Sequence, residues 1–257
     1  MTPDWTPLTR EFDRWTEAGL CLPVWWRDDD AIAPSPALER LDTLAARHEL
    51  PVHLAVIPQG ATQALAAYVR ATPNLIPVVH GWAHASHALA GAKKAEYPDT
   101  RPATEMAGEA AQSLTRLTGL FGADLVAMFV PPWNRIAPRL VADLAGLGYH
   151  ALSTFTPRDA AFAAPGLARI NTHLDPIAWK SGRGLVAPDT LIAQMVQHLT
   201  DRREGRADNR EPYGILTHHL VHDAAIWGFT DALLSRLMHG PTQPWNSTDL
   251  TQKDTNT

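Results

Sequence analysis

The stretch Leu75-Ile76-Pro77-Val78-Val79-His80-Gly81-Trp82-Ala83-His84 joins a short apolar run to two histidines four residues apart. An apolar run without polar alternation is typical of a strand in a parallel sheet that is covered on both faces. In a parallel β/α barrel, functional side chains lie at the carboxyl ends of the strands and in the loops that follow. This stretch therefore predicts a barrel strand with a site just beyond its end.

The same kind of apolar run recurs along the chain, separated by segments with helical spacing of apolar residues. The predicted strands are residues 22–26, 52–57, 76–79, 125–130, 149–154, 168–173 and 214–217, and the predicted helices are residues 35–48, 104–118, 138–147, 188–202 and 224–238. Seven strand units predict an α/β protein with a distorted parallel (β/α) barrel, complete or one unit short. We expect residues 1–240 to form this single domain and the polar residues 241–257 to form a flexible tail.

Composition narrows the class of protein. The 257 residues carry a formal net charge of -5, so we expect no nucleic-acid partner. No run approaches the roughly 20 apolar residues of a membrane helix, and the first residues lack the apolar core of a signal peptide. We therefore expect a cytoplasmic protein with no membrane partner. Cys21 is the only cysteine, which excludes an internal disulfide, and we expect it to be buried.

A metal site is predicted where two strand ends carry complementary ligands. The run Asp28-Asp29-Asp30 follows the first apolar strand, and adjacent carboxylates near a buried strand end repel one another unless a cation lies close. His80 and His84 supply imidazoles that can bind one ion together. With one carboxylate they form a two-histidine, one-carboxylate set that leaves coordination positions open for water and substrate.

Other strand ends also carry polar or aromatic residues. They are Pro131-Pro132-Trp133-Asn134-Arg135 after the fourth strand, His173-Leu174-Asp175 with Trp179 after the sixth, and His218-His219 with His222-Asp223 after the seventh. Six of the 12 histidines fall into two short clusters at predicted strand ends, 80–87 and 218–222. Adjacent residues at a strand end face opposite ways, so only one of His218 and His219 should face the site.

Taken in order, these motifs resemble the polysaccharide deacetylase family, the family 4 carbohydrate esterases, of which this chain would be a divergent member. The resemblance rests on an Asp pair, His-x-x-x-His, Pro-aromatic, Asp with a downstream Trp, and Leu-x-His, from about Trp25 to His222. It implies a distorted β/α barrel, a bound divalent metal, usually zinc or cobalt, and hydrolysis of N-acetyl groups on amino sugars. The implied partner is a small-molecule or oligosaccharide substrate.

The resemblance also implies roles for single residues. Asp29 corresponds to the catalytic base, and Asp30, His80 and His84 correspond to the metal ligands, although Asp28 and Asp29 could form the Asp pair instead. His218 corresponds to the general acid, with His219 as the alternative. Asp175 would keep that histidine protonated. For substrate binding the interpretation gives Trp133, Asn134 and Arg135, with Trp133 able to stack on a sugar ring.

Three positions depart from the family pattern. Ala31 stands where the family has Gly, Gly81 where it has Ser or Thr, and Val130 where it has the Arg that keeps the catalytic Asp ionised. Arg27 or Arg135 could take over the role of that Arg. Two further functions stay open: another metal-dependent amide or ester hydrolase, and a non-catalytic barrel that binds a saccharide or nucleotide-sugar.

Overall fold

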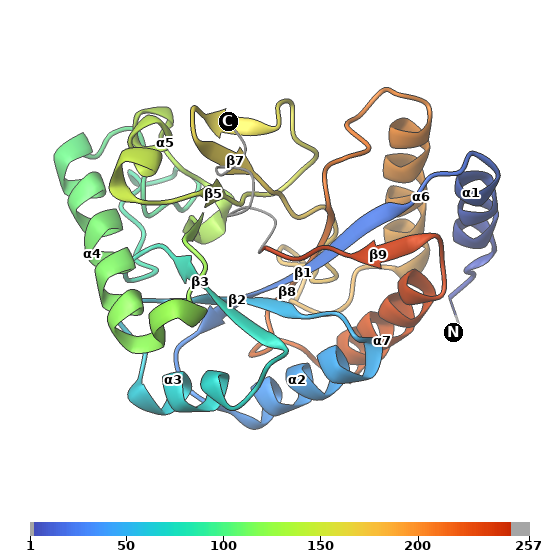
Figure 1. Ribbon diagram of the computed structural model, residues 1–257, viewed down its shortest axis with the longest axis horizontal. Coiled ribbons are helices and arrows are strands. Elements are labelled where there is room, and N and C mark those ends of the chain that lie inside the picture. Colours follow the sequence, from blue (N-terminus) through green and yellow to red (C-terminus); the bar gives the residue numbers. More distant parts are fainter. Residues whose placement is uncertain (1–2, 248–257) are drawn as a thin grey trace.

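A parallel sheet that curls on itself forms the centre of the structure, and helices cover its outer face (Figure 1). This computed structural model describes residues 3–247. The strands are β1 (Leu22–Ala31), β2 (Val52–Val56), β3 (Leu75–His80), β4 (Met128–Val130), β5 (Ala151–Leu152), β6 (Phe162–Ala164), β7 (Leu167–Arg169), β8 (Tyr213–Thr217) and β9 (Thr242–Pro244). The helices are α1 (Thr6–Glu17), α2 (Pro36–His48), α3 (Gln63–Arg70), α4 (Ala103–Phe121), α5 (Pro138–Leu144), α6 (Pro188–Arg203) and α7 (Ala224–Met238).

The predicted parallel barrel is confirmed. The strand order is β6-β7-β5-β4-β3-β2-β1-β8, and the seven predicted strands pair with one another in parallel. The short strand β6, which was not predicted, pairs antiparallel with β7 at the edge. The chain after β7 completes the ring: the amide of His173 donates to the carbonyl of Gly214, at 2.7 Å, and the amide of Leu216 donates to the carbonyl of Leu174, at 2.8 Å. The carboxyl ends of the strands therefore meet at one mouth.

Two helices and two short strands were not predicted. Helix α1 buries Leu8, Phe12 and Trp15, and the indole of Trp15 donates to the carbonyl of Leu199 in α6, at 3.2 Å. Pro7 lies in the first turn of this helix, where a proline costs no hydrogen bond.

No helix in residues 3–247 is both long enough and apolar enough to span a membrane.

The C-terminal tail differs from the expectation over the part that the structure describes. Strand β9 pairs in parallel with the start of β1, and the amide of Trp245 donates to the carbonyl of Val24, at 2.7 Å. The Trp245 ring packs edge-on against Trp25 with the ring centres 5.7 Å apart. Residues 248–257 of the predicted tail lie outside the described residues.

Cys21 is exposed, so the prediction that it is buried was wrong.

The core has two layers, one on each side of the curled sheet. The larger layer lies between strands and helices, and the smaller one fills the barrel with Trp25 and six smaller apolar side chains. Trp25 donates through its indole to the carbonyl of Asn171, at 3.0 Å. Gly214 faces this indole: a β-carbon there would lie 2.5 Å from Nε1 of Trp25 and 2.7 Å from the carbonyl oxygen of Asn171. The large indole fills the barrel only because residue 214 has no side chain.

We expect Gly214→Ala to lower the free energy of unfolding by about 2 kcal/mol, the scale of overpacking in a dense core. Gly108→Ala is the matched control, because Gly108 is exposed on α4 and a β-carbon there meets nothing within 4 Å. This control should stabilise the protein by about 0.5–1 kcal/mol, as alanine does in a helix. Urea unfolding of both variants measures the difference, and equal stabilities would contradict the packing described.

Candidate metal and catalytic site

A bulge in β1 decides which way its three consecutive acidic side chains point. Asp28 pairs with Leu54 and Ala31 with Val56, so three steps along β1 match two along β2. Within this bulge Asp30 has a φ of 78°, a left-handed conformation. In a regular strand Asp30 would share the face of Asp28. The bulge instead lets Asp29 and Asp30 line one pocket at the barrel mouth.

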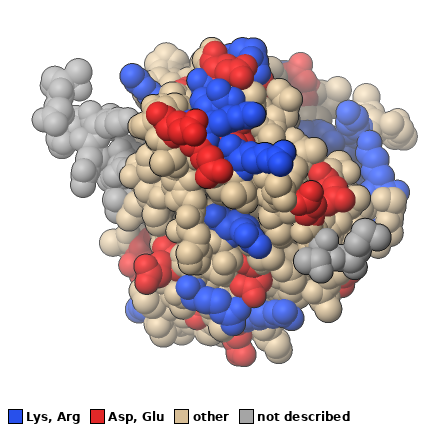
Figure 2. Space-filling view, turned by 90° about the vertical axis from the view of Figure 1, so that its right-hand side faces the viewer, with Lys and Arg blue, Asp and Glu red and all other residues tan. Residues whose placement is uncertain are grey.

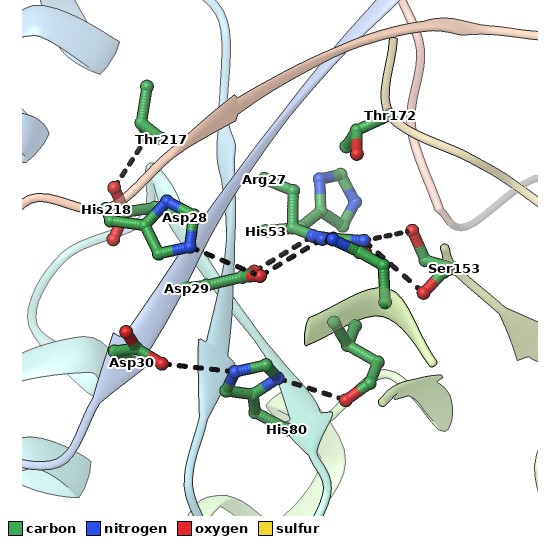
Figure 3. Close-up of polar contacts among 12 residues, drawn as sticks. Arg27, Asp28, Asp29, Asp30, His53, His80, Ser153, Thr172, Thr217 and His218 are labelled. Atoms are coloured by element: carbon green, nitrogen blue, oxygen red, sulfur yellow. Dashed lines mark hydrogen bonds and ion pairs between the residues drawn. The ribbon is translucent and has the colours of Figure 1, made fainter. Parts of the chain in front are cut away.

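Asp30, His80 and His84 converge on one point. Their ligand atoms all lie within 4.8 Å of one another, and Nε2 of each histidine is 3.2 Å from the same oxygen, Oδ1 of Asp30. Figure 3 shows Asp30 and His80 pointing toward each other from β1 and the end of β3. His84 reaches the group from the following loop with a φ of 55°. The structure thus brings together the three residues that the sequence predicted as metal ligands.

The donor set fits a divalent cation. Nδ1 of His80 donates to the carbonyl of Val130, at 3.0 Å, which leaves Nε2 of the neutral ring as a bare lone pair facing the carboxylate. Lone pairs from two rings and an ionised carboxylate repel one another unless a positive charge lies among them. A tetrahedral or five-coordinate ion would satisfy all three and keep positions open toward the pocket.

The pKa shifts show how strongly Asp30, His80 and His84 influence one another. Burial opposes ionisation of Asp30, but the hydrogen bond and charge of His80 outweigh it and hold the pKa of Asp30 well below its usual range. His80 is buried as well, yet Asp29 and Asp30 raise its pKa. Burial and the charge of His80 lower the pKa of His84. The cluster therefore attracts one positive charge strongly, whether a proton on His80 or a metal ion.

Asp29 is held by a fully buried arginine. Arg27 lies two residues earlier on the same face of β1, and its guanidinium makes a bidentate pair with Asp29: Nε to Oδ1 at 2.9 Å and Nη2 to Oδ2 at 3.0 Å (Figure 3). The remaining N–H groups donate to Oγ of Ser153, at 2.7 Å, and to Oδ1 of Asn134, at 2.8 Å. Of the two arginines considered for this role, Arg27 makes the contact, whereas Arg135 donates to the carbonyl of Lys94.

The two adjacent histidines after β8 point in opposite directions. His218 lines the pocket, and its Nε2 lies 3.9 Å from Oδ2 of Asp29. His219 is buried behind the sheet, where its Nδ1 and backbone amide both bond Asp28. Burial opposes the charge on Asp28, but His219 lowers the pKa of Asp28, and Asp28 in turn raises the pKa of His219. His218 is therefore the histidine that faces Asp29, and Asp28 is committed to the fold.

Asp175 lies in the same pocket but makes no hydrogen bond with His218 in the part of the chain that is described. Its oxygens accept from the amide of Ile177, at 2.9 Å, and from the indole of Trp179, at 2.7 Å. The Trp179 ring in turn packs edge-on against His218 with the ring centres 4.7 Å apart. Burial raises the pKa of Asp175, which the charge of His218 opposes. Asp175 thus interacts with His218 by its charge and through the ring of Trp179.

The three residues expected to bind substrate all line the pocket. The Trp133 ring lies against His84 with the ring centres 4.4 Å apart. Asn134 has its amide oxygen occupied by Arg27, so its first role is to hold that guanidinium. Trp133 and Asn134 both have left-handed backbones, with φ of 58° and 57°. Arg135 is exposed at the rim.

Glu96, which no sequence motif marked, is a buried carboxylate that organises the loop between the two histidines. Its oxygens accept from the backbone amides of Ala83, at 2.8 Å, and Trp82, at 3.1 Å. Burial raises the pKa of Glu96, and these amide donors oppose that effect. A β-carbon on Gly81 would lie 2.0 Å from Oε2 of Glu96. The glycine that departs from the family pattern therefore makes room for this carboxylate.

Comparison with known proteins rests on structure. The sequence matches no protein-family model and no curated protein. A putative polysaccharide deacetylase from Mycobacterium smegmatis matches with a TM-score of 0.60 and 15% identity, covering 84% of this chain and 76% of that one. A family 4 acetyl xylan esterase from Clostridium thermocellum in complex with a cobalt ion matches with a TM-score of 0.51 and 14% identity, covering 90% of this chain and 91% of that one. A CE4 family pseudoenzyme from Bacillus anthracis matches with a TM-score of 0.51 and 14% identity, covering 90% of this chain and 65% of that one.

These likenesses show that the chain has the fold of the polysaccharide deacetylases, the family 4 carbohydrate esterases, at low sequence identity. The resemblance inferred from the order of the motifs is thereby confirmed at the level of the fold. Because the same fold also occurs in a pseudoenzyme, activity has to be argued from the site itself.

We expect Glu96→Ala to destabilise the protein by about 1–3 kcal/mol, because it leaves the part-buried amides of Trp82 and Ala83 without an acceptor. Glu105→Ala is the control, since Glu105 is exposed in the first turn of α4. Differential scanning calorimetry gives both values. If Glu96→Ala melted like Glu105→Ala, the carboxylate would not hold this loop.

Proposed function

We propose that this protein is a metal-dependent hydrolase that removes an acyl group, such as acetyl, from the nitrogen of an amino sugar or a related saccharide. The observation that carries the proposal is the single pocket lined by Asp30, His80 and His84 together with Asp29 and His218. The deacetylase fold supports it. Histidine nitrogen and carboxylate oxygen favour zinc or cobalt at this site. A divalent ion there would lower the pKa of a bound water and polarise the acyl carbonyl.

Asp29 is placed to act as the general base. It lies next to the metal ligand Asp30 on β1, and the fork of Arg27 keeps both of its oxygens oriented. A carboxylate that is oriented by a buried guanidinium is positioned to accept a proton from the attacking water. Because its rotamer is fixed before substrate arrives, no reorganisation is needed at the moment of attack.

His218 is placed to act as the general acid. The leaving amine needs a proton, and Nε2 of His218 faces the same space as Asp29 from the neighbouring strand end. The Trp179 ring restricts the imidazole from one side, and the carboxylate of Asp175 accepts a hydrogen bond from that indole, at 2.7 Å. Asp29 would thus take a proton from the attacking water, and His218 would give a proton to the leaving amine.

We expect the purified protein to bind one divalent ion per chain, and Asp30→Ala to weaken that binding by about a hundredfold or more, since a charged ligand is lost. Asp143→Ala, an exposed position on α5, is the control. Affinity should also fall as the pH drops, because the raised pKa of His80 lets a proton compete with the metal. Zinc titration calorimetry measures all three. A wild-type protein that binds no stoichiometric ion at neutral pH would overturn the proposed function.

We expect Arg27→Lys to lower kcat for acetate release by about a hundredfold, because one ammonium cannot reproduce the fork that orients Asp29. The substitution should also cost about 3 kcal/mol of stability, since Ser153 and Asn134 lose buried partners. The exposed Arg135→Lys serves as the stability control. Wild-type kcat in correctly folded Arg27→Lys protein would show that the fork of Arg27 is not needed to orient Asp29.

A further inference from the structure

Four cationic side chains surround the mouth of the pocket that holds the candidate metal ligands. They are Lys94, Arg135, Lys180 and Arg183, and each of them is exposed and lines a cavity of about 890 Å³. The chain as a whole has a net charge of -5 and contains only four lysines, two of which lie at this rim. The rim of the pocket therefore carries a cluster of positive charges, although the protein as a whole is negatively charged.

The rim cations have no carboxylate partners within residues 3–247, since no ion pair involves any of them. The acids of the pocket are engaged below the rim: Asp29 with Arg27, and Asp30 with the histidines. The side of the molecule that carries α1 and α6 differs, because basic and acidic side chains are interspersed there (Figures 1 and 2). One example is the pair between Arg203 on α6 and Glu11 on α1, at 2.8 Å.

The four cations fall into two pairs, one beside Trp133 and the other in the turn after Trp179. Lys94 lies 6.0 Å from the centre of the Trp133 ring, which itself contacts His84. Arg135 joins Lys94 by donating to its carbonyl, at 2.7 Å. Lys180 and Arg183 belong to the turn that follows Trp179, whose ring packs on His218.

We propose that the substrate is an anionic N-acylated amino sugar, one that carries a phosphate or a carboxylate in addition to the scissile amide. This inference rests on the proposed function. An acyl group placed at Asp30, His80 and His84 leaves the rest of the sugar between the two cationic pairs. An anion there receives charge-assisted hydrogen bonds, which are about twice as strong as neutral ones. Unpaired cations at a pocket mouth also raise the local concentration of an anionic substrate.

The first experiment measures binding without catalysis. Protein stripped of metal by a chelator is titrated with N-acetylglucosamine, N-acetylglucosamine 1-phosphate and N-acetylmuramic acid. Removing metal ensures that phosphate or carboxylate oxygens are not held by an ion. We expect at least one anionic sugar to bind about tenfold more tightly than the neutral one, the ratio that a hydrogen bond between charged groups supplies. The two anionic probes separate a phosphate from a carboxylate.

The second experiment removes the rim charges. In Lys180→Gln/Arg183→Gln, and separately in Lys94→Gln/Arg135→Gln, the preference for the anionic sugar should fall about tenfold in at least one double variant. Lys93→Gln is the matched control, because Lys93 is equally exposed in the same loop but does not line the cavity. Raising the salt concentration should weaken wild-type binding of the anionic sugar and leave the neutral sugar unchanged.

Equal binding of neutral and anionic sugars by the wild type would overturn the inference, as would an anionic preference that survives in both double variants. Acetate release from the same three compounds by zinc-loaded protein tests the chemistry separately. If the anionic preference is seen but no acetate is released, the rim is correct and the proposed hydrolysis is wrong. If acetate is released equally well from the neutral sugar, the hydrolysis stands and the rim inference fails.

Discussion

The buried guanidinium of Arg27 is the interaction on which the candidate site depends. It ties Asp29 on β1 to Ser153 at the end of β5 and to Asn134 after β4. A buried charge with an unmet hydrogen bond costs several kcal/mol, so strand ends that are far apart in sequence are held in register by one cation. The base, the wall of the pocket and the barrel interior are therefore not independent features.

Two departures from the deacetylase pattern are matched by new contacts nearby. Val130 stands in place of the arginine of the third motif. Arg27, two residues before Asp29 on β1, supplies the guanidinium that pairs with the Asp29 carboxylate. Gly81 replaces a hydroxyl residue, and the carboxylate of Glu96 occupies the space and binds the loop amides. In both cases a charged side chain from another place in the chain makes the contacts around the departing position.

The sequence was sufficient for the fold class because seven unalternating apolar runs separated by helices leave few arrangements other than a parallel barrel. It also located the mouth, since His80, His84 and His218 all follow such runs and parallel strands bring their ends together. It failed where long-range contacts decide the structure. Nothing local marks Glu96 as a partner of the histidine loop, and β9 is placed by its pairing with β1 and by the packing of Trp245 on Trp25.

The acidic run could not be resolved from sequence for a related reason. An apolar strand was expected to stop at Trp26, but β1 continues to Ala31 because each charged side chain finds a partner inside the barrel, behind the sheet or at the mouth. The orientation of Asp30 depends on one supernumerary residue in β1 relative to β2. Deleting any single residue between Asp28 and Ala31 would restore regular alternation and turn a carboxylate away from the imidazoles. The number of residues in this segment therefore matters as much as their identity, because an insertion or deletion here would turn acidic side chains to the wrong face even if all three were kept.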